Sequence, residues 1–191
     1  KPMINKSSKL IQIKNKKNLT IRVSMDHYTA AQHELIRGKN SWIPLINGLK
    51  WLHQKNFNID LACRILEGEN ELDMRKGFQE LIKKLSLNID AFNPSNLVIF
   101  PEMKINALTP EISEDCWSVI DKSKDTVMCS NSRMVVKKRD NPKPVILSCT
   151  LITNDKDFEL GNNFKTAKDT TYLKHPYCSQ FCVLGNSKCA I

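Results

Sequence analysis

The chain has 191 residues, of which 41% are hydrophobic, and a formal net charge of +9. This length and composition allow one substantial core, or a core with a small appended module, and they exclude a disordered tail. No stretch approaches the roughly 18 consecutive apolar residues of a membrane span, and no secretory signal pattern is present, so we expect a cytoplasmic protein without a membrane partner.

The positive charge raises the question of a nucleic-acid partner, because a basic surface attracts phosphate without base-specific contacts. The lysines are scattered through an asparagine-rich chain, and the tightest clusters lie at residues 14–17 and 137–139. Neither cluster is interleaved with aromatic side chains that would stack on bases. Solvated surface charge is the simpler interpretation, and we do not expect nucleic acid as the main partner.

The first 18 residues are basic and polar, and the chain opens with Lys1. We interpret this stretch as a linker or a truncated upstream element, and we expect the chain to be a piece of a longer polypeptide. The sequence that follows has a regular pattern of apolar residues. Alternation and helical spacing predict, in chain order, a strand over 19–24, a helix over 41–56, a strand over 58–66, a helix over 69–85 and a strand over 97–100.

Strand, helix, strand, helix, strand is the order of βαβ units in a parallel sheet. Residues 19–110 are therefore predicted to be α/β. Three strands cannot close a barrel, because small closed barrels need about eight. The sheet is either open or a part of a barrel whose earlier strands lie outside this chain. Ser41 is the expected N-cap of the first helix.

After Pro110 the pattern changes, and we treat residues 111–191 as a separate, cysteine-rich module. A short helix is predicted over 112–120. Two β-rich stretches, 127–138 and 144–152, flank a turn and form a predicted hairpin, and the polar residues 153–174 are predicted to be a loop.

The chain has seven cysteines and no signal peptide, so a clustered set indicates metal binding or catalysis more than disulfides. Cys178, Cys182 and Cys189 are crowded near the C-terminus, and the predicted hairpin carries Cys129 and Cys149. Cysteines a few residues apart bring thiolates together at a small cost in chain entropy. The pattern predicts a [4Fe-4S] cluster held by four of these five thiols.

Zinc is the main alternative metal, because four-cysteine and three-cysteine, one-histidine sites use similar spacings, and His175 lies three residues before Cys178. The Cys-x-x-Cys knuckle of most zinc ribbons is missing, and unrelated thiols are a further alternative. Cys63 in a strand and Cys116 in a helix are interpreted as ordinary core residues.

Two segments carry a resemblance to a known family: Ile-Arg-Val-Ser-Met-Asp-His-Tyr at 21–28, and His-Glu-Leu-Ile-Arg-Gly at 33–38, followed by the helix over 42–57. In this order they resemble the middle of radical S-adenosylmethionine (SAM) enzymes. The resemblance covers roughly residues 19–105. The cysteine-bearing remainder resembles the auxiliary-cluster extension, of SPASM or twitch type, that follows the barrel in many members.

The resemblance implies an incomplete TIM-like radical SAM barrel with a small C-terminal hairpin and cysteine module. Ser24 and Asp26 would contact bound S-adenosyl-L-methionine at the strand end, and Arg37 would bind its carboxylate. A strand-end turn with self-bonded side chains is the alternative at 24–26. His27 and His33 line the same cavity or lie in an exposed loop, and the residue past the third strand, Glu102, is a further cavity candidate.

One departure from the family is clear: the Cys-x-x-x-Cys-x-x-Cys motif of the cofactor-reducing cluster, and the Gly-Gly-Glu that follows it, do not occur in the 191 residues. Both are expected upstream of Lys1, so this chain alone is not expected to cleave S-adenosylmethionine.

The resemblance implies a parent enzyme whose 5′-deoxyadenosyl radical abstracts hydrogen from a small-molecule or peptide substrate, with a flavodoxin or ferredoxin as electron donor. The alternative is a non-catalytic zinc module that binds nucleic acid or an acidic partner. A split gene product without independent activity is a third possibility.

Overall fold

The computed structural model describes residues 6–185, and the chain divides into two compact units, Lys1–Glu102 and Met103–Ile191. The first unit is α/β with a small parallel sheet, as predicted, and the second has a small antiparallel sheet. Neither sheet closes into a barrel within the described range.

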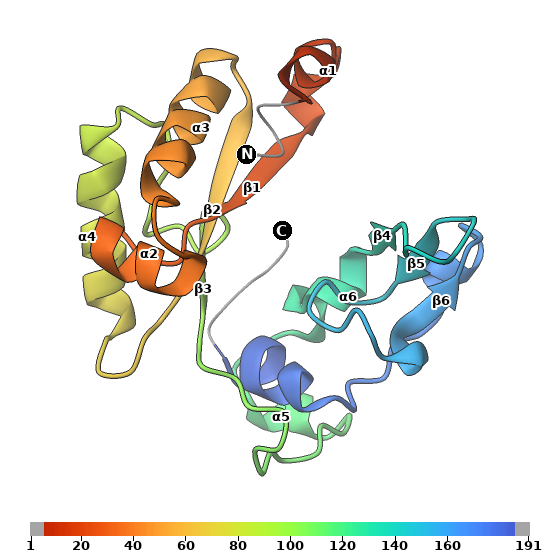
Figure 1. Ribbon diagram of the computed structural model, residues 1–191. Coiled ribbons are helices and arrows are strands. Elements are labelled where there is room, and N and C mark those ends of the chain that lie inside the picture. The colour runs from red at the N-terminus through yellow and green to blue at the C-terminus, as the bar shows by residue number, and fades with distance from the viewer. Residues whose placement is uncertain (1–5, 186–191) are drawn as a thin grey trace. The chain divides into compact units, whose positions relative to one another are not determined.

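The first unit contains the βαβαβ order that the sequence predicts (Figure 1). Its elements are α1 (Ser7–Ile11), η2 (Lys16–Asn18), β1 (Thr20–Ser24), α2 (Ala30–Arg37), α3 (Trp42–Gln54), β2 (Asn58–Arg64), α4 (Glu71–Lys84) and β3 (Leu97–Phe100). The strands are parallel in the order β1-β2-β3, with Thr20 opposite Asn58 and Leu61 opposite Leu97.

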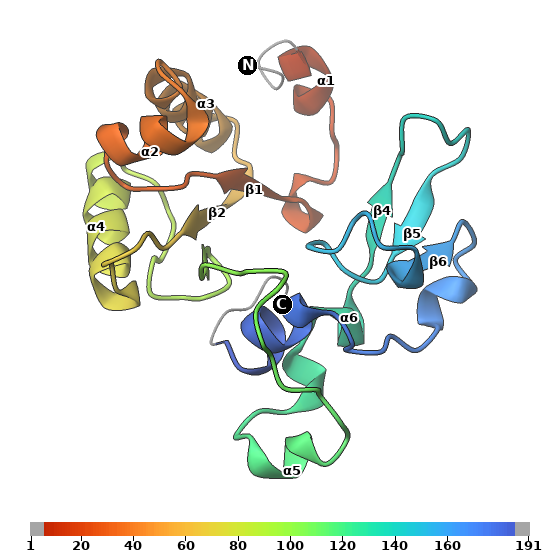
Figure 2. The ribbon, with the colours of Figure 1, turned by 60° about the horizontal axis from the view of Figure 1, so that its bottom comes forward.

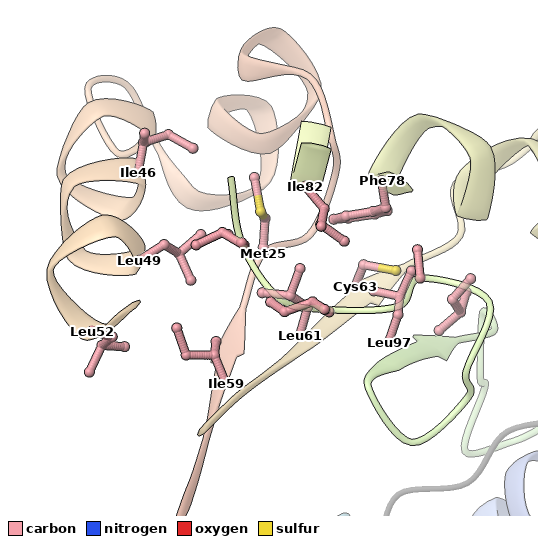
Figure 3. Packing of buried hydrophobic residues seen from close by; sticks show 14 of the residues in the cluster. Met25, Ile46, Leu49, Leu52, Ile59, Leu61, Cys63, Phe78, Ile82 and Leu97 are labelled. Carbon is pink, nitrogen blue, oxygen red and sulfur yellow. The ribbon is translucent and has the colours of Figure 1, made fainter. Parts of the chain in front are cut away.

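The core of the first unit lies between the sheet and helices α3 and α4, which lie on the same side of it (Figures 1 and 3). Alternate residues of β2 face this core, among them Leu61 and Cys63, which are both 1% exposed. Leu49 from α3 and Phe78 from α4 pack into the same cluster. Burying such side chains contributes several kcal/mol. It also fixes the register of β2, because a one-residue slip would turn Leu61 and Cys63 outward.

Local contacts explain where the helices begin and end. Asn70 accepts a hydrogen bond from the Asp73 backbone N–H (3.0 Å) and caps α4. Ser41 is the N-cap residue of α3, as predicted, but its hydroxyl makes no cap bond. The Glu34 carboxylate accepts from the Trp42 N–H instead (3.1 Å). Glu34 can do this because it lies on α2, a helix that the sequence pattern missed.

The second unit is built from short elements (Figure 2). They are α5 (Cys116–Val119), η3 (Lys124–Thr126), α6 (Met128–Asn131), β4 (Met134–Val136), β5 (Val145–Leu147), η4 (Lys156–Phe158), β6 (Glu159–Gly161), η5 (Thr166–Lys168) and the π-helical turn η6 (Cys178–Val183). The predicted hairpin is confirmed as the antiparallel pair β4 and β5.

Two predictions for this unit are wrong. The first β-rich stretch begins with the helical turn α6, so Cys129 lies on a helix and not on a strand. The predicted loop contains β6, which pairs with β5 across an irregular register and completes a three-stranded sheet. Both elements have only three or four residues, which is too short for a periodic pattern to show. In neither unit does the described chain form a helix that could cross a membrane.

Candidate metal centre

Four cysteines from three separate segments of the second unit line one small cavity, here called the cysteine cavity. Cys129 comes from α6, Cys149 follows β5, and Cys178 and Cys182 come from η6. The structure therefore brings together every predicted cluster ligand within residues 6–185. The fifth candidate, Cys189, lies outside the described residues.

The turn η6 places two of these thiols one turn apart. Its ring is wider than that of an α-helix, since the Leu184 N–H donates to the Ser179 carbonyl (2.9 Å), five residues back. The Lys122 Nζ donates to the carbonyl oxygens of Cys182 (2.5 Å) and Gly185 (2.8 Å) and closes the end of the turn. Gly185 has to be glycine here, because a Cβ would lie 2.5 Å from the Phe181 carbonyl oxygen.

The cysteine cavity is small and mostly apolar. Its volume is about 20 Å³, enough for one water molecule. Its other walls are Met128, Leu151, Ile152, Phe158, Thr171, Leu173 and Tyr177. The pKa of the Cys178 thiol is raised from 9.0 to about 11. Burial is the largest cause, and the neighbouring thiols of Cys149 and Cys129 act in the same direction, against a backbone hydrogen bond that lowers the pKa.

Hydrogen-bond donors and cations lie around the cavity, where they would stabilise negatively charged sulfur. The Leu151 backbone N–H donates to the Cys149 sulfur (3.4 Å), and the Arg133 guanidinium donates to the Cys129 carbonyl (2.5 Å). The Thr171 hydroxyl oxygen is buried and has no hydrogen-bond partner in the described chain. Four thiols, an N–H donor, nearby cations and an unpaired hydroxyl fit a metal–thiolate centre.

The cysteines do not form the arrangement of a single-ion site. No group of three or more His, Cys, Asp or Glu side chains among residues 6–185 could hold one metal ion as the side chains stand. His175 does not line the cavity, and its Nδ1 accepts from the Tyr177 N–H (3.1 Å), so it is not placed as a zinc ligand. Cys63 is a core residue as predicted, whereas the prediction for Cys116 is wrong, because this residue is only half-buried.

A second group of polar residues lies at the carboxyl end of the parallel sheet. Asp26, with its side chain 3% exposed, accepts from Nε and Nη2 of Arg37, the latter at 3.3 Å, and lies 3.4 Å from Arg64 Nε. The structure thus brings Asp26 and Arg37 together, as partners of each other. For Asp26, this contradicts the alternative of a strand-end turn with self-bonded side chains. Ser24 is exposed at the end of β1.

The two histidines at this edge are buried, each 2% exposed, so the exposed-loop alternative is wrong. His27 Nδ1 accepts from the Thr29 N–H (2.9 Å), which leaves the proton on Nε2 to bond the Glu69 carboxylate (2.9 Å). The Glu69 carboxylate also accepts from the Leu66 N–H (2.9 Å), so these hydrogen bonds connect the end of β1 to the loop after β2. Burial lowers the pKa of His33, with Asp26 opposing the shift.

Glu102 is exposed past β3. Sequence reasoning missed Arg64, Glu69, Lys122 and Thr171. The position of Arg64 at the end of β2, in line with Asp26 at the end of β1, was a usable signal. The other three lie in irregular segments, where no periodic pattern points to them.

Comparisons of the chain with protein-family models, with curated proteins and with solved structures gave no match. The case for a function therefore rests on the two groups of residues just described.

Proposed function

We propose that the second unit binds an iron–sulfur cluster through the thiolates of the cysteine cavity, and that the chain is the C-terminal half of a radical S-adenosylmethionine enzyme. The observation that carries the proposal is the meeting of Cys129, Cys149, Cys178 and Cys182 around one cavity. These residues are up to 53 positions apart in sequence (182 − 129), and the fold of the second unit brings them together.

A cluster and a single zinc ion require different spacings of their four thiolates. Four sulfurs on zinc lie about 3.8 Å apart, given tetrahedral bonds of about 2.3 Å. Ligands of a cubane cluster bind different iron atoms and are spaced more widely. In the described chain the four thiols line one cavity and do not form a single-ion group, so binding of either metal requires their side chains to move. The cavity as it stands holds only one water, so the thiol side chains have to turn outward when a cluster binds.

The charges near the cavity support the same assignment. A cubane cluster with four thiolates is an anion, and burying it needs nearby positive charge or hydrogen-bond donors. Lys122 and Arg133 are held on the backbone of two ligand residues, Cys182 and Cys129. When bound, an iron–sulfur cluster supplies one-electron chemistry.

The first unit supports the barrel part of the proposal. Its strands follow one another in the order 1-2-3 with both crossover helices on one face, as in a (β/α)₈ barrel. One half of a doubly wound sheet has the same arrangement, so the choice of a barrel rests on the sequence resemblance over residues 19–105. By strand alternation, Ser24 and Asp26 are on the face opposite the helices, which is the inner face of a barrel. The guanidinium of Arg37 already binds Asp26, so a cofactor carboxylate would share it with that side chain.

Metal content tests the proposal. The full chain, purified without oxygen and reconstituted with ferrous iron and sulfide, is expected to be brown, with the visible charge-transfer absorbance of an iron–sulfur cluster. A colourless protein that takes up zinc and no iron would reject the cluster in favour of the zinc module.

The radical-enzyme half of the proposal has a separate test. The DNA that encodes the residues before Lys1 is expected to specify Cys-x-x-x-Cys-x-x-Cys in frame with this chain. An upstream reading frame without this motif would reject a radical enzyme and would leave the cluster assignment standing.

A further inference from the structure

Thr29, His27 and Glu69 form a chain of hydrogen bonds at the carboxyl end of the parallel sheet. The Thr29 hydroxyl oxygen lies 2.8 Å from His27 Nδ1, and His27 Nε2 lies 2.9 Å from a carboxylate oxygen of Glu69. His27 and Glu69 are 42 positions apart in sequence, so the fold of the first unit brings them together. Hydroxyl, imidazole and carboxylate in this order are the arrangement that activates a hydroxyl as a nucleophile.

The imidazole of His27 is held in the orientation that a general base needs. Its Nε2–H is bonded to Glu69, whose other carboxylate oxygen accepts from the Leu66 N–H (2.9 Å). The Tyr28 ring stacks on the imidazole, with 4.2 Å between the ring centroids. The unprotonated Nδ1 accepts from the Thr29 N–H, and the Thr29 hydroxyl is therefore the donor in its own bond to the same nitrogen.

Solvent reaches these three groups at Thr29. His27 is 2% exposed, whereas Thr29 is exposed. Thr29 is the N-cap residue of α2, but its hydroxyl makes no cap bond and is bonded to His27 instead. The backbone N–H groups of Ala31 and Gln32, in the first turn of α2, have no acceptor in the described chain. Donors of this kind stabilise the oxyanion that forms when a hydroxyl attacks a carbonyl group.

We infer that Thr29 is a nucleophile for acyl transfer from an activated ester, with His27 as its general base and Glu69 as a positioning residue. The Thr29 oxygen forms a bond to the carbonyl carbon, and its proton passes to His27 Nδ1. The imidazolium then gives this proton to the leaving oxygen as the bond between that oxygen and the carbonyl carbon breaks, and an acyl-threonine remains. Water hydrolyses the acyl-threonine, with His27 taking a proton from the water and returning it to the Thr29 oxygen.

This activity does not depend on the proposed function, since none of the three residues lines the cysteine cavity. The test treats the full chain with p-nitrophenyl acetate, stops the reaction with acid and locates the acetyl group by mass spectrometry of the peptides. Wild type is expected to carry acetyl on the Thr29 oxygen, as an ester that hydroxylamine removes, unlike the amides that form at lysines. A wild type without acetyl on Thr29 would overturn the inference.

Four variants test the roles of the residues. Thr29→Val removes the nucleophile, so its release of p-nitrophenol is the background that is subtracted from the other rates. Thr29→Ser keeps the hydroxyl, and Glu69→Gln keeps the shape of the carboxylate without its charge. Thr20→Val removes an exposed hydroxyl at the start of β1 and is the control.

Above this background, the rate is expected to fall at least about tenfold in Glu69→Gln, because the imidazolium loses its carboxylate. Thr29→Ser is expected to retain most of the rate, and Thr20→Val all of it. Acetylation of lysines in the same samples is expected to be unchanged, which separates loss of the nucleophile from loss of the fold. A wild-type rate equal to that of Thr29→Val, or a folded Glu69→Gln protein as fast as wild type, would contradict the inference. If Glu69→Gln does not fold, the rates of Thr29→Val and Thr29→Ser decide, since Thr29 is exposed.

Discussion

Asp26 is the residue on which the carboxyl edge of the parallel sheet depends. Its buried carboxylate neutralises Arg37 and lies against Arg64, and both cations are partly exposed. We predict that Asp26→Asn lowers the free energy of unfolding of the first unit by about 1–2 kcal/mol, because two solvent-screened guanidinium groups then lose a charged acceptor. Urea-induced unfolding measures this change. Glu80→Gln removes an exposed carboxylate from α4 and is the control. An Asp26→Asn protein as stable as that control would contradict the prediction.

The thiol of Cys178 gives the metal-free protein a defined dependence on pH. Its folded pKa of about 11 lies above the reference value of 9.0. Below pH 9 the thiol is protonated in the folded and unfolded chains, and its contribution to stability is complete. Between pH 9 and about 11 the unfolded chain loses the proton first, so stability falls as pH rises. Denaturant titrations across this window are expected to show that the free energy of unfolding falls less steeply with pH in Cys178→Ala than in wild type. Identical slopes in the two proteins would contradict the raised pKa of Cys178.

Gly77 shows how one residue fits α4 to the end of β1. Glycine inside a helix normally costs about 1 kcal/mol relative to alanine. Here a Cβ would lie 2.6 Å from carbons of the Tyr28 ring, which stacks on His27 (4.2 Å) and meets the edge of Phe78 (5.9 Å). We predict that Gly77→Ala destabilises the first unit by about 1–3 kcal/mol despite the gain in helix propensity.

Thermal unfolding of Gly77→Ala in the wild-type and Tyr28→Leu backgrounds checks this contact. The alanine is expected to lower the midpoint in the first background and to lower it less, or raise it, in the second. A rise in both backgrounds would show that the Tyr28 ring does not limit the position.

The sequence predicted those elements in which apolar residues recur at strand or helix spacing along a buried face. The strands β1, β2 and β3 and the helices α3 and α4 fall within their predicted ranges, because each packs against one core and needs a regular apolar pattern. Helix α2 was missed because His33 is the only residue in it that is buried. Its end carried a signal, since Gly38 follows it with a φ of 93°.

The sequence predicted which residue types form the candidate site, but it did not predict which side chains contact one another. Cysteine spacing was enough to select Cys129, Cys149, Cys178 and Cys182, because metal chemistry restricts the residue type. The pairing of Asp26 with Arg37 depends on how α2 returns to the sheet, and one-dimensional spacing does not contain that information. The same holds for Thr171, which reaches the cavity from a polar, aperiodic segment.

At the scale of the whole molecule, the two units are expected to respond differently to metal. A cluster would join three segments of the second unit, which has short strands and little regular structure, so binding adds to its folding free energy. The first unit has its own apolar core. Removal of the cluster with a chelator is therefore predicted to raise hydrogen exchange in β4, β5 and η6 and to leave β1, β2 and β3 unchanged. Equal loss of protection in both units would contradict this.

The most direct measurement is the iron and acid-labile sulfide content of the reconstituted full chain and two variants. Wild type and the control Cys116→Ser, whose thiol lies outside the cavity, are each expected to hold about four iron and four sulfide ions. The double variant Cys178→Ser/Cys182→Ser is expected to lose most of both. Undiminished iron and sulfide in the double variant would contradict the claim that the cysteine cavity holds the cluster.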